Sequence, residues 1–583
     1  MFFLLPGLLF LRRNQLAVVE RLVLSVGLSL AVSIGVLTAL GLMFGLSFPV
    51  LVVGGIVVAT LPARLPLPRG ALISSSPPRV VFIPGALFLV VAAIQAERPA
   101  LFTTFDAQAL WAPLADGIAR SGSLTPSWVP TILKGFPPGI AMVAGVFSVP
   151  AGHLNGRLAL LIPPIFGALT ITVTILLAGR FKVPGARSMA IAVLVATPLL
   201  GRAIEFHDDF MIAFLVAATV YVGLSVGSWQ GWIAVGAVAA GAASVKQLGA
   251  IAFAFVAVLL WSRRASLRSW IVAAGGVVVA APWYLGNLVR FGDPVYPFLS
   301  NGSDRALSLI IKDQASFLAS RGADSLEFVG WLAVALMGVG LAFGTWYWFR
   351  RDRRMAFSFI GLMVVFIGVW SRSNYGSRQL LAIYPVCASV AGLGLATVPQ
   401  FFERRVRRAL RIGIAAVWFL IVGLSLWNVA SESRGRPPFG GRTGLYAVAA
   451  GKWFKPTVAA TLDPPLGGDE FGGIGQIWQR LRELDPTARV LSFDTRGLYI
   501  PQKVLSAGED VEAVRAYLAG GADAQHAAYL DIGVRFVLSR RAVDPHHKVL
   551  YPLGPWRDLE RRPDLYRRIF RNSVGSLYEV LPK

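Results

Sequence analysis

The segment Phe136–Val149, which reads Phe-Pro-Pro-Gly-Ile-Ala-Met-Val-Ala-Gly-Val-Phe-Ser-Val, decides how the rest of the chain is folded. It is apolar but only about 14 residues long, whereas a membrane-spanning helix needs roughly 20 residues. Its Pro-Pro-Gly start suits a helix that lies in the membrane interface or re-enters it better than a helix that spans it. We therefore predict that this segment does not cross the bilayer, so that the chain before it and after it stays on one face.

The composition predicts a polytopic membrane protein. Of 583 residues, 55% are hydrophobic and only 15% are charged, values far from those of a soluble enzyme. The net charge of +24 comes from short basic clusters between apolar runs, and not from one polar face that could bind nucleic acid. The single cysteine, Cys387, lies in an apolar run, so we expect neither a disulfide within the chain nor a redox role.

Apolar runs predict about thirteen membrane-spanning helices. They lie near residues 16–40, 42–61, 80–95, 157–178, 188–204, 209–227, 230–244, 248–261, 270–286, 328–349, 355–371, 379–398 and 409–428.

The basic residues then give the orientation, because cytoplasmic connections are enriched in lysine and arginine. Five basic connections fall on one side together with the N-terminus, and we predict that this side is cytoplasmic. They contain Arg64, Arg69 and Arg79; Arg180, Lys182 and Arg187; Arg263, Arg264 and Arg268; Arg350, Arg351, Arg353 and Arg354; and Arg404, Arg405, Arg407, Arg408 and Arg411. The acids at Asp106, Asp208 and Asp209 then share the external face.

The composition becomes polar after about residue 430. Alternating patterns predict strands at 490–493, 534–539 and 577–581 and helices at 477–484 and 511–518, which together indicate a small external α/β domain. We therefore divide the chain into an N-terminal transmembrane hairpin with its cytoplasmic loop (1–79), a transmembrane catalytic domain (80–429) and a periplasmic or extracellular domain (430–583).

Over residues 80–400 or so, an ordered set of motifs resembles the GT-C class of membrane glycosyltransferases. The set begins after an acid that follows the first helix of this unit. Its motifs are Gly156-Arg157-Leu158, Asp209-Phe210-Met211-Ile212-Ala213-Phe214, Ser244-Val245-Lys246-Gln247, Pro282-Trp283-Tyr284-Leu285-Gly286-Asn287 and Gly292-Asp293-Pro294-Val295-Tyr296-Pro297-Phe298. The chain is most similar in this respect to the bacterial aminoarabinose and protein-mannosyl transferases that use polyprenyl-phosphate sugars. It differs from them in having Ala109-Leu110-Trp111 where the family often has an aromatic-His pair, and in two additional N-terminal helices.

This resemblance implies an inverting transfer of a sugar from a polyprenyl-phosphate donor. The acceptor would be a glycan, a lipid or a protein on the external face of the bacterial inner membrane, and neither the sugar nor the acceptor is identified by the sequence. The expected partners are therefore the lipid donor, the acceptor and the bilayer, and not nucleic acid.

Asp106 is our candidate general base, because a positioned carboxylate can accept the proton that the acceptor loses. It follows the first helix of the GT-C-like unit in the run Phe102-Thr103-Thr104-Phe105-Asp106. The alternative is structural: the Asp106 side chain would cap a helix that begins at Ala107.

Cations at external helix ends are candidates for binding the donor phosphate, whose negative charge grows as it leaves. Lys246 and Arg378 fit this role best, and Arg202 and Arg290 are weaker candidates. The alternative for each is that it contacts lipid headgroups.

Four residues near position 208 are candidate ligands for a divalent ion such as Mg, Mn or Zn. They are Asp209, Asp208, His207 and Glu205. Adjacent helical residues point in different directions, so they cannot all face one ion, and Asp209 fits the second acid of the family best. Alternatively, Asp208 caps the following helix.

Two other functions stay open on the sequence. A transporter or flippase of envelope precursors also buries charge among many helices, but it predicts inverted repeats, which we do not find. A non-catalytic subunit of an envelope assembly complex would use the external domain for binding and would not need Asp106.

Overall fold

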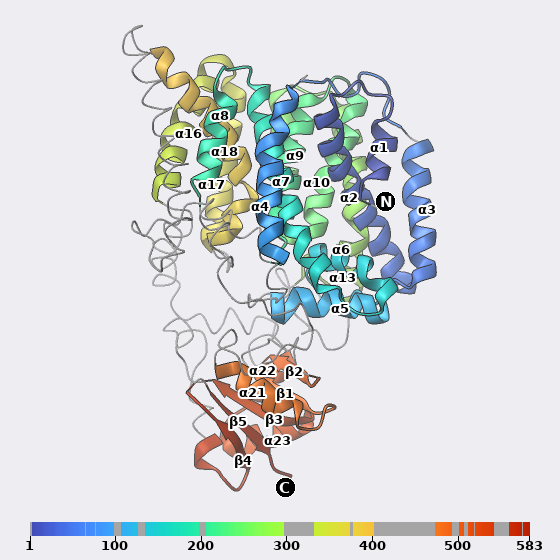
Figure 1. The fold of residues 1–583 in the computed structure, drawn as a ribbon, viewed down its shortest axis with the longest axis vertical. Helices are drawn as coiled ribbons and strands as arrows, with labels where there is room; N and C mark the ends of the chain where they lie inside the picture. Colours follow the sequence, from blue (N-terminus) through green and yellow to red (C-terminus); the bar gives the residue numbers. More distant parts are fainter. Residues whose placement is uncertain are drawn as a thin grey trace.

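A computed structural model describes most of the chain and shows a bundle of helices joined to a small α/β unit (Figure 1). The residues that it describes are 3–64, 66–75, 77–97, 107–125, 135–197, 206–296, 331–372, 377–401, 473–492, 501–506, 511–517, 519–540, 559–573 and 575–582.

The bundle consists of helices that mostly coincide with the predicted apolar runs, and the helices Leu5–Leu11 and Ala112–Ser121 are additional. They are α1 (Leu5–Leu11), α2 (Val18–Phe44), α3 (Phe48–Arg64), α4 (Phe82–Glu97), α5 (Ala112–Ser121), α6 (Gly139–Ser148), α7 (Gly156–Arg180), α8 (Ala186–Val195), α9 (Asp209–Ser225), α10 (Trp232–Val245), α11 (Ile251–Ser262), α12 (Leu267–Val277), α13 (Ala281–Phe291), α16 (Trp331–Arg351), α17 (Arg353–Arg372) and α18 (Tyr384–Thr397). Each of the first twelve predicted spans coincides with one of these helices or with the continuous pair α12–α13, and the last one, 409–428, lies outside the described residues.

Three stretches of helix in the described part are both long and apolar enough to cross a bilayer by themselves: α2, α7 and the continuous stretch Leu267–Phe291, which comprises α12 and α13. Several shorter apolar helices, such as α9 and α10, are buried among them. The chain is therefore a membrane protein, while the number of its spans stays a prediction.

Helix α10 lies at the centre of the bundle, packed against α2, α9 and α12. Its sequence is rich in glycine and alanine, which lets neighbouring backbones approach closely. A Cβ on Gly236 would lie 2.0 Å from the carbonyl oxygen of Ala273 in α12. The position of Lys246, which directly follows α10, is therefore fixed by tight backbone packing.

The short helix α6 covers one end of the bundle. Its ten residues extend about 15 Å, half the thickness of the hydrocarbon core. It packs against α5, and both lie with α13 at the end of the bundle that faces the α/β unit (Figure 1). That the segment 136–149 does not cross the bilayer stays a prediction.

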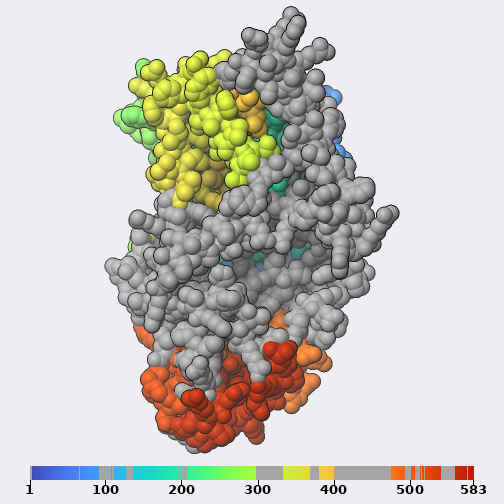
Figure 2. All heavy atoms as spheres, turned by 90° about the vertical axis from the view of Figure 1, so that its left-hand side faces the viewer, coloured from blue at the N-terminus to red at the C-terminus, as the bar shows by residue number. Residues whose placement is uncertain are grey.

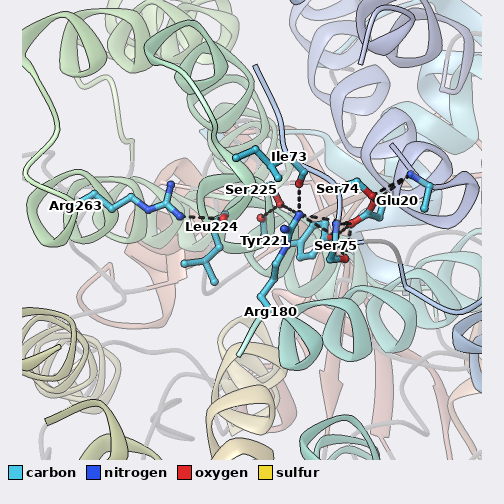
Figure 3. A network of polar contacts seen from close by, with 10 residues as sticks. Glu20, Ile73, Ser74, Ser75, Arg180, Tyr221, Leu224, Ser225 and Arg263 are labelled. Atoms are coloured by element: carbon cyan, nitrogen blue, oxygen red, sulfur yellow. Dashed lines mark hydrogen bonds and ion pairs between the residues drawn. The ribbon is translucent and has the colours of Figure 1, made fainter. Parts of the chain in front are cut away.

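The predicted cytoplasmic connections meet at the other end, which we call the arginine end. The Arg180 Nη2 group donates to the carbonyl oxygen of Ile73 at 2.6 Å, and Arg263 Nη2 donates to that of Leu224 at 2.9 Å. Three connections that are far apart in the sequence are thus joined by arginine side chains (Figure 3).

A buried acid, Glu20, lies at the centre of the network at the arginine end (Figure 3). Its carboxylate accepts hydrogen bonds from the hydroxyls of Ser74, Ser75 and Tyr221, and it lies 3.5 Å from Arg180 Nη2. No residue pattern predicts this network, which links α2 to α7, α9 and the segment 73–75.

The α/β unit contains a five-stranded sheet in the order β2-β1-β3-β5-β4. Its strands are β1 (Arg489–Ser492), β2 (Lys503–Ser506), β3 (Val534–Arg540), β4 (Tyr566–Arg571) and β5 (Gly575–Val580), and its helices are α21 (Gly473–Arg482), α22 (Val511–Tyr517) and α23 (Ala522–Asp531). Strands β2, β1 and β3 are parallel, whereas β5 pairs antiparallel with both β3 and β4. The predicted strands and helices are present, and β2, β4 and α23 are additional.

Helices cover both faces of this sheet. On one face, Ile477 and Trp478 of α21 pack against Phe536 of β3. On the other face, Tyr529 of α23 packs in the cluster that contains Val537 of the same strand. The alternation of Phe536 and Val537 between the two faces follows from the two-residue repeat of a strand and gives a three-layer α/β/α unit.

Candidate active site

The candidate site begins where α10 ends. Lys246 has an extended backbone, with φ −162° and ψ 151°, so the helix stops and the short turn η7 (Gln247–Ala250) follows. This change of direction turns the Lys246 side chain toward the start of α9, where its Nζ atom donates to Asp208 Oδ1 at 3.2 Å. The side chains of this pair are only 7% and 1% exposed. The structure therefore places the predicted phosphate-binding lysine and one predicted acid in a single buried ion pair.

Asp208 occupies the N-cap position of α9, but its side chain does not form a capping hydrogen bond. The capping role considered for it is therefore wrong, and the carboxylate pairs with Lys246 instead. Asp209 is the first residue of α9, where a negative charge is stabilised by the helix dipole. His207 and Asp209 are also buried, so the three consecutive predicted residues lie together at this end of the bundle.

Trp111 forms the other side of the lysine site. It ends the π-helical turn η2 (Ala107–Trp111) and is 1% exposed. The Lys246 Nζ atom lies 5.6 Å from the centroid of the indole ring, within the distance at which an aromatic face attracts a cation. The residue that stands where the family often has an aromatic-His pair thus contacts the candidate cation.

A second contact set holds the residues next to Lys246. The carbonyl oxygen of Gly135 accepts three side-chain hydrogen bonds, from Gln247 Nε2 at 3.0 Å, Trp283 Nε1 at 3.2 Å and Asn287 Nδ2 at 2.8 Å. All three side chains are buried. We call this arrangement the Gly135 clamp. It connects the segment before α6 to η7 and to α13, and so holds in place the part of the chain that covers the site.

The clamp gives a physical role to the Pro-Trp-Tyr-Leu-Gly-Asn motif, because its Trp283 and Asn287 are two of the three donors. Tyr296 from the next motif packs directly on Gly135, where an added Cβ would lie 2.3 Å from the tyrosine ring. The Tyr296 ring itself stacks on Phe291 with centroids 4.2 Å apart. Both motifs therefore contact the backbone at Gly135.

The structure describes the other predicted site residues to different extents. Arg290 is exposed in the last turn of α13 and forms no hydrogen bond or ion pair with the described residues. The backbone of Arg378 lies in η10 (Ser377–Ala382), which packs against α9 and η7, and its side chain lies outside the described part. Asp106, Arg202 and Glu205 lie outside the described residues altogether.

The described part of the chain contains no group of three metal-ligating side chains of the kind His, Cys, Asp or Glu. Asp208 is engaged by the Lys246 ammonium, so His207 and Asp209 would need a further ligand such as Glu205 to hold an ion. The divalent ion therefore stays a prediction.

Sequence reasoning missed Trp111 as a contact of Lys246 and missed the Gly135 clamp entirely. The signal for the clamp was present, since Gln247, Trp283 and Asn287 all occur in the motifs that carry the resemblance. Their common target is a backbone carbonyl, which no residue pattern reveals.

Comparison with known proteins gives matches among solved structures alone: no protein-family model and no curated protein matches the chain. The apo structure of ArnT from Cupriavidus metallidurans aligns with a TM-score of 0.52 and 17% identity, over 86% of this chain and 99% of that one. The archaeal oligosaccharyltransferase AglB from Archaeoglobus fulgidus aligns at 0.47 and 12%, over 84% and 73%. The arabinofuranosyltransferase AftD from Mycobacteria aligns at 0.42 and 14%, over 88% of this chain but 40% of that one.

At these identities the likeness concerns the fold, and the ArnT alignment is strong enough to establish it. It extends over nearly all of ArnT. The resemblance predicted from the sequence is confirmed at this level: the chain has the GT-C fold of the membrane glycosyltransferase ArnT.

Proposed function

We propose that the chain is an inverting glycosyltransferase that uses a polyprenyl-phosphate-linked sugar. The acceptor would be a glycan, a lipid or a protein at the external face of the bacterial inner membrane. The observation that carries this proposal is the buried Lys246 ammonium, which lies between the Asp208 carboxylate and the Trp111 ring at the end of the bundle covered by α5 and α6.

Lys246 has the chemistry needed to stabilise the leaving phosphate. An ammonium group carries three N–H donors, and among the described residues Lys246 Nζ donates one of them, to Asp208. The remaining donors are available for phosphate oxygens. In a buried site a fixed cation stabilises developing negative charge more strongly than it does in water, so binding here would favour departure of the polyprenyl phosphate.

Asp106 is the proposed general base. It directly precedes the turn η2, which brings Trp111 beside Lys246, and this supports a place for Asp106 near the reacting atoms. The acceptor oxygen or nitrogen would attack the anomeric carbon and pass its proton to the Asp106 carboxylate. As that bond forms, the bond to the phosphate oxygen breaks on the opposite side, and the polyprenyl phosphate leaves with the electron pair, which inverts the configuration.

A divalent ion held by Asp209, with help from Asp208, His207 or Glu205, is a separate proposal. Its role would be to neutralise the phosphate together with Lys246. Transfer that continues unchanged in excess chelator, after the protein has been washed free of metal, would remove the ion from the mechanism.

The function is tested by transfer of label from radiolabelled polyprenyl-phosphate sugars in purified membranes. Wild type is compared with Asp106→Asn, Asp209→Asn and Lys246→Met. Arg120→Gln is the matched control, because Arg120 is a half-exposed cation of α5 at the same end of the bundle, and exposed ion pairs contribute little. Full transfer by Asp106→Asn would exclude it as the base.

The same assay separates the glycosyltransferase from the other two functions considered. If folded wild-type protein transfers no sugar from any of several lipid donors, a transporter or a non-catalytic subunit becomes the better account. Loss of transfer in the three variants, with retention in Arg120→Gln, supports the proposal.

A further inference from the structure

An apolar cavity lies among the helices near the arginine end of the bundle, apart from the Asp208–Lys246 site. Twelve aliphatic, aromatic and methionine side chains from α7 and its C-terminal cap, α9, α11, α16, α17 and α18 line it, and the empty space among them is about 380 Å³ when open solvent is included. Phe181 and Leu224 line it at the ends of α7 and α9, and Trp348 and Met355 line it where α16 ends and α17 begins. The cavity is therefore near the end of the bundle that we predict to be cytoplasmic.

The chemistry of the lining restricts what the cavity can hold. Water needs two or more polar partners in a buried site, whereas the surface that the lining side chains present to the cavity is apolar. Its wall includes a row of aromatic rings, because Trp348 makes edge contacts with Phe181 and with Phe359, with centroids 5.5 Å and 5.4 Å apart. A hydrocarbon chain fits such a lining, and the surrounding bilayer supplies hydrocarbon chains.

The face of the bundle that carries the cavity is available to lipid. Figure 2 shows α16 and α17 as the yellow-green and yellow surface of the bundle. Phe357, Val364 and Val365 of α17 are more than 60% exposed, as expected of side chains that face lipid tails. A lipid can therefore approach this side of the bundle from the membrane.

Four arginines lie in and beside the turn between α16 and α17, next to the lining residues Trp348 and Met355. They are Arg350, Arg351, Arg353 and Arg354, all of them exposed. The first three stack over aromatic rings of α16, at 4.1 Å, 4.4 Å and 5.3 Å from the ring centroids, and within the described residues none of the four forms an ion pair. Stacking fixes a guanidinium and leaves its N–H edge for an anion.

A fifth arginine lies next to another lining residue. Arg263, at the end of α11, donates to the carbonyl oxygens of Leu224 and Val226 at 2.9 Å and 3.2 Å, and Leu224 itself lines the cavity. Arginines thus lie beside lining residues of two separate parts of the bundle, at the end that we predict to face the anionic cytoplasmic leaflet.

We propose that this cavity binds one acyl chain of an anionic phospholipid, with the phosphate held by the arginines of the α16–α17 turn. The apolar lining selects the chain, and the arginines without carboxylate partners select the negative headgroup. The site lies at the end of the bundle opposite Lys246, so it is independent of the proposed sugar transfer.

The probe for this site is phosphatidylglycerol with a photoactivatable diazirine in the middle of one acyl chain. It is added to the purified full-length protein in phosphatidylcholine nanodiscs, and labelled peptides are identified by mass spectrometry after irradiation. A phosphatidylcholine analogue with the same diazirine is the headgroup control. We expect the anionic probe to label the peptides that contain Leu224, Val258 and Met355 at much lower concentration than the zwitterionic probe.

Two variants fill the cavity at half-buried lining residues, Val258→Trp and Met355→Trp. Each should abolish this labelling without unfolding the bundle, which circular dichroism and gel filtration check. Val53→Trp is the matched control, because Val53 is a 54% exposed residue of α3 on the far side of the bundle (Figure 1). It should leave the labelling unchanged.

The headgroup contact is tested with the double variant Arg350→Gln/Arg353→Gln. One arginine near an anionic lipid surface changes binding by about fivefold, so the concentration for half-maximal labelling should rise on the order of 30-fold. Arg64→Gln/Arg69→Gln, which removes two exposed arginines near α3, should leave it unchanged.

Three results would overturn the proposal. Equal labelling by the two lipids would show that the headgroup is not recognised. Labelling that persists in both tryptophan variants would show that the chain lies outside the cavity. Equal effects of the two double arginine variants would show a general attraction to the basic surface in place of a site.

Discussion

The two ends of the helical bundle each bury an acid beside a base. At the arginine end, Glu20 lies 3.5 Å from Arg180, and their side chains are 0% and 12% exposed. At the other end, Asp208 lies 3.2 Å from Lys246, with side chains 1% and 7% exposed. The two pairs have nearly the same burial and separation, yet their surroundings differ.

The Glu20 pair is held by fixed groups of the protein. Besides Glu20, the Arg180 guanidinium contacts the Ile73 carbonyl oxygen, the Ser225 hydroxyl and the Tyr221 ring. All of the polar contacts are made by its Nη2 atom, so several fixed groups of the fold surround this one end of the guanidinium, while Nε is buried without a hydrogen-bond partner among the described residues. This pair connects the ends of α2 and α7 and so serves the fold.

In the other pair, the Lys246 ammonium has N–H donors beyond the one that binds Asp208. A lysine ammonium is a compact charge on a flexible stem, and the face of Trp111 adds attraction without taking an N–H donor. A buried ion pair can therefore serve the fold or a ligand, and here the difference lies in how many protein groups surround the cation: Glu20, Ile73, Ser225 and Tyr221 around Arg180, but only Asp208 and Trp111 among the described residues around Lys246.

The largest expected effect tests the active-site side of this comparison. Lys246→Met should lower sugar transfer by about 10²–10³-fold, as loss of one preorganised charge-stabilising donor does in other enzymes. It should also destabilise the bundle, because it leaves the Asp208 carboxylate buried without its cation. Both are measured on purified protein, by label transfer and by denaturant titration in mixed micelles.

The double variant Lys246→Met/Asp208→Asn separates the two effects. Removing both charges should restore much of the stability, since a buried pair replaced as a whole is often neutral, while transfer stays low. Recovery of transfer in the double variant would show that the lysine acts only through the fold.

Glu20→Ala should produce the opposite pattern at the arginine end. Breaking a buried pair by removing one partner costs about 3–5 kcal/mol, so the free energy of unfolding should fall by about that amount. Transfer per folded molecule should stay near wild type, because no part of this network lies at the site end. Glu20→Gln, which keeps acceptors for the Ser74 and Ser75 hydroxyls, is the milder control. A large selective loss of transfer in either variant would break the distinction between the two ends.

The Gly135 clamp allows the site end to be loosened without touching its charges. Asn287→Leu removes one donor to the Gly135 carbonyl and should cost about 1–3 kcal/mol of stability, the usual effect of a lost buried hydrogen bond. Because the clamp holds η7 next to Lys246, we expect a moderate fall in transfer as well. Leu288→Ala is the control, since Leu288 is an exposed neighbour on the same helix. The clamp would have no role in positioning if both variants behaved alike in transfer.

The smallest effect concerns an acid that is exposed. Hydrogen bonds from Thr487, with Arg535 nearby, hold the pKa of the Asp485 carboxyl below its usual value of 3.8. Because the pKa is lower in the folded than in the unfolded state, the ionised carboxylate stabilises the α/β unit at pH values above the unfolded pKa of 3.8. This stabilisation is lost as the pH falls through the folded pKa. Asp485→Asn should therefore flatten the pH dependence of β1 hydrogen exchange below about pH 4, with little change at neutral pH. An identical profile in wild type and variant would show that this acid does not contribute.

Most of the helical fold follows from the sequence because long apolar runs have few alternatives in a membrane. The α/β unit was harder to predict. Strand β2 has four residues, and β4 lies at the sheet edge with Arg567 and Arg568 exposed, so neither shows the apolar alternation of β3. Helix α23, with Gln525 and His526 buried, lacks a clear apolar face.

At the candidate site, the sequence identified the residues and missed their pairing. Lys246 was assigned to a phosphate and Asp208 to a metal or a helix cap, and only the packing of α9 against α10 shows that they bind each other. Glu20 was missed because it lies at the edge of an apolar run and in no motif. Ion pairs between distant helices depend on packing angles, which residue patterns do not contain.

The Gly135 clamp has a consequence for comparing this chain with its relatives. Its three donors bind a main-chain oxygen, which every residue type possesses, so a change at Gln247, Trp283 or Asn287 has no compensating side chain at position 135. Paired substitutions, the usual trace of a contact in related sequences, should therefore be missing here. The expected pattern is instead a conserved glycine at this position, where a Cβ would clash with Tyr296.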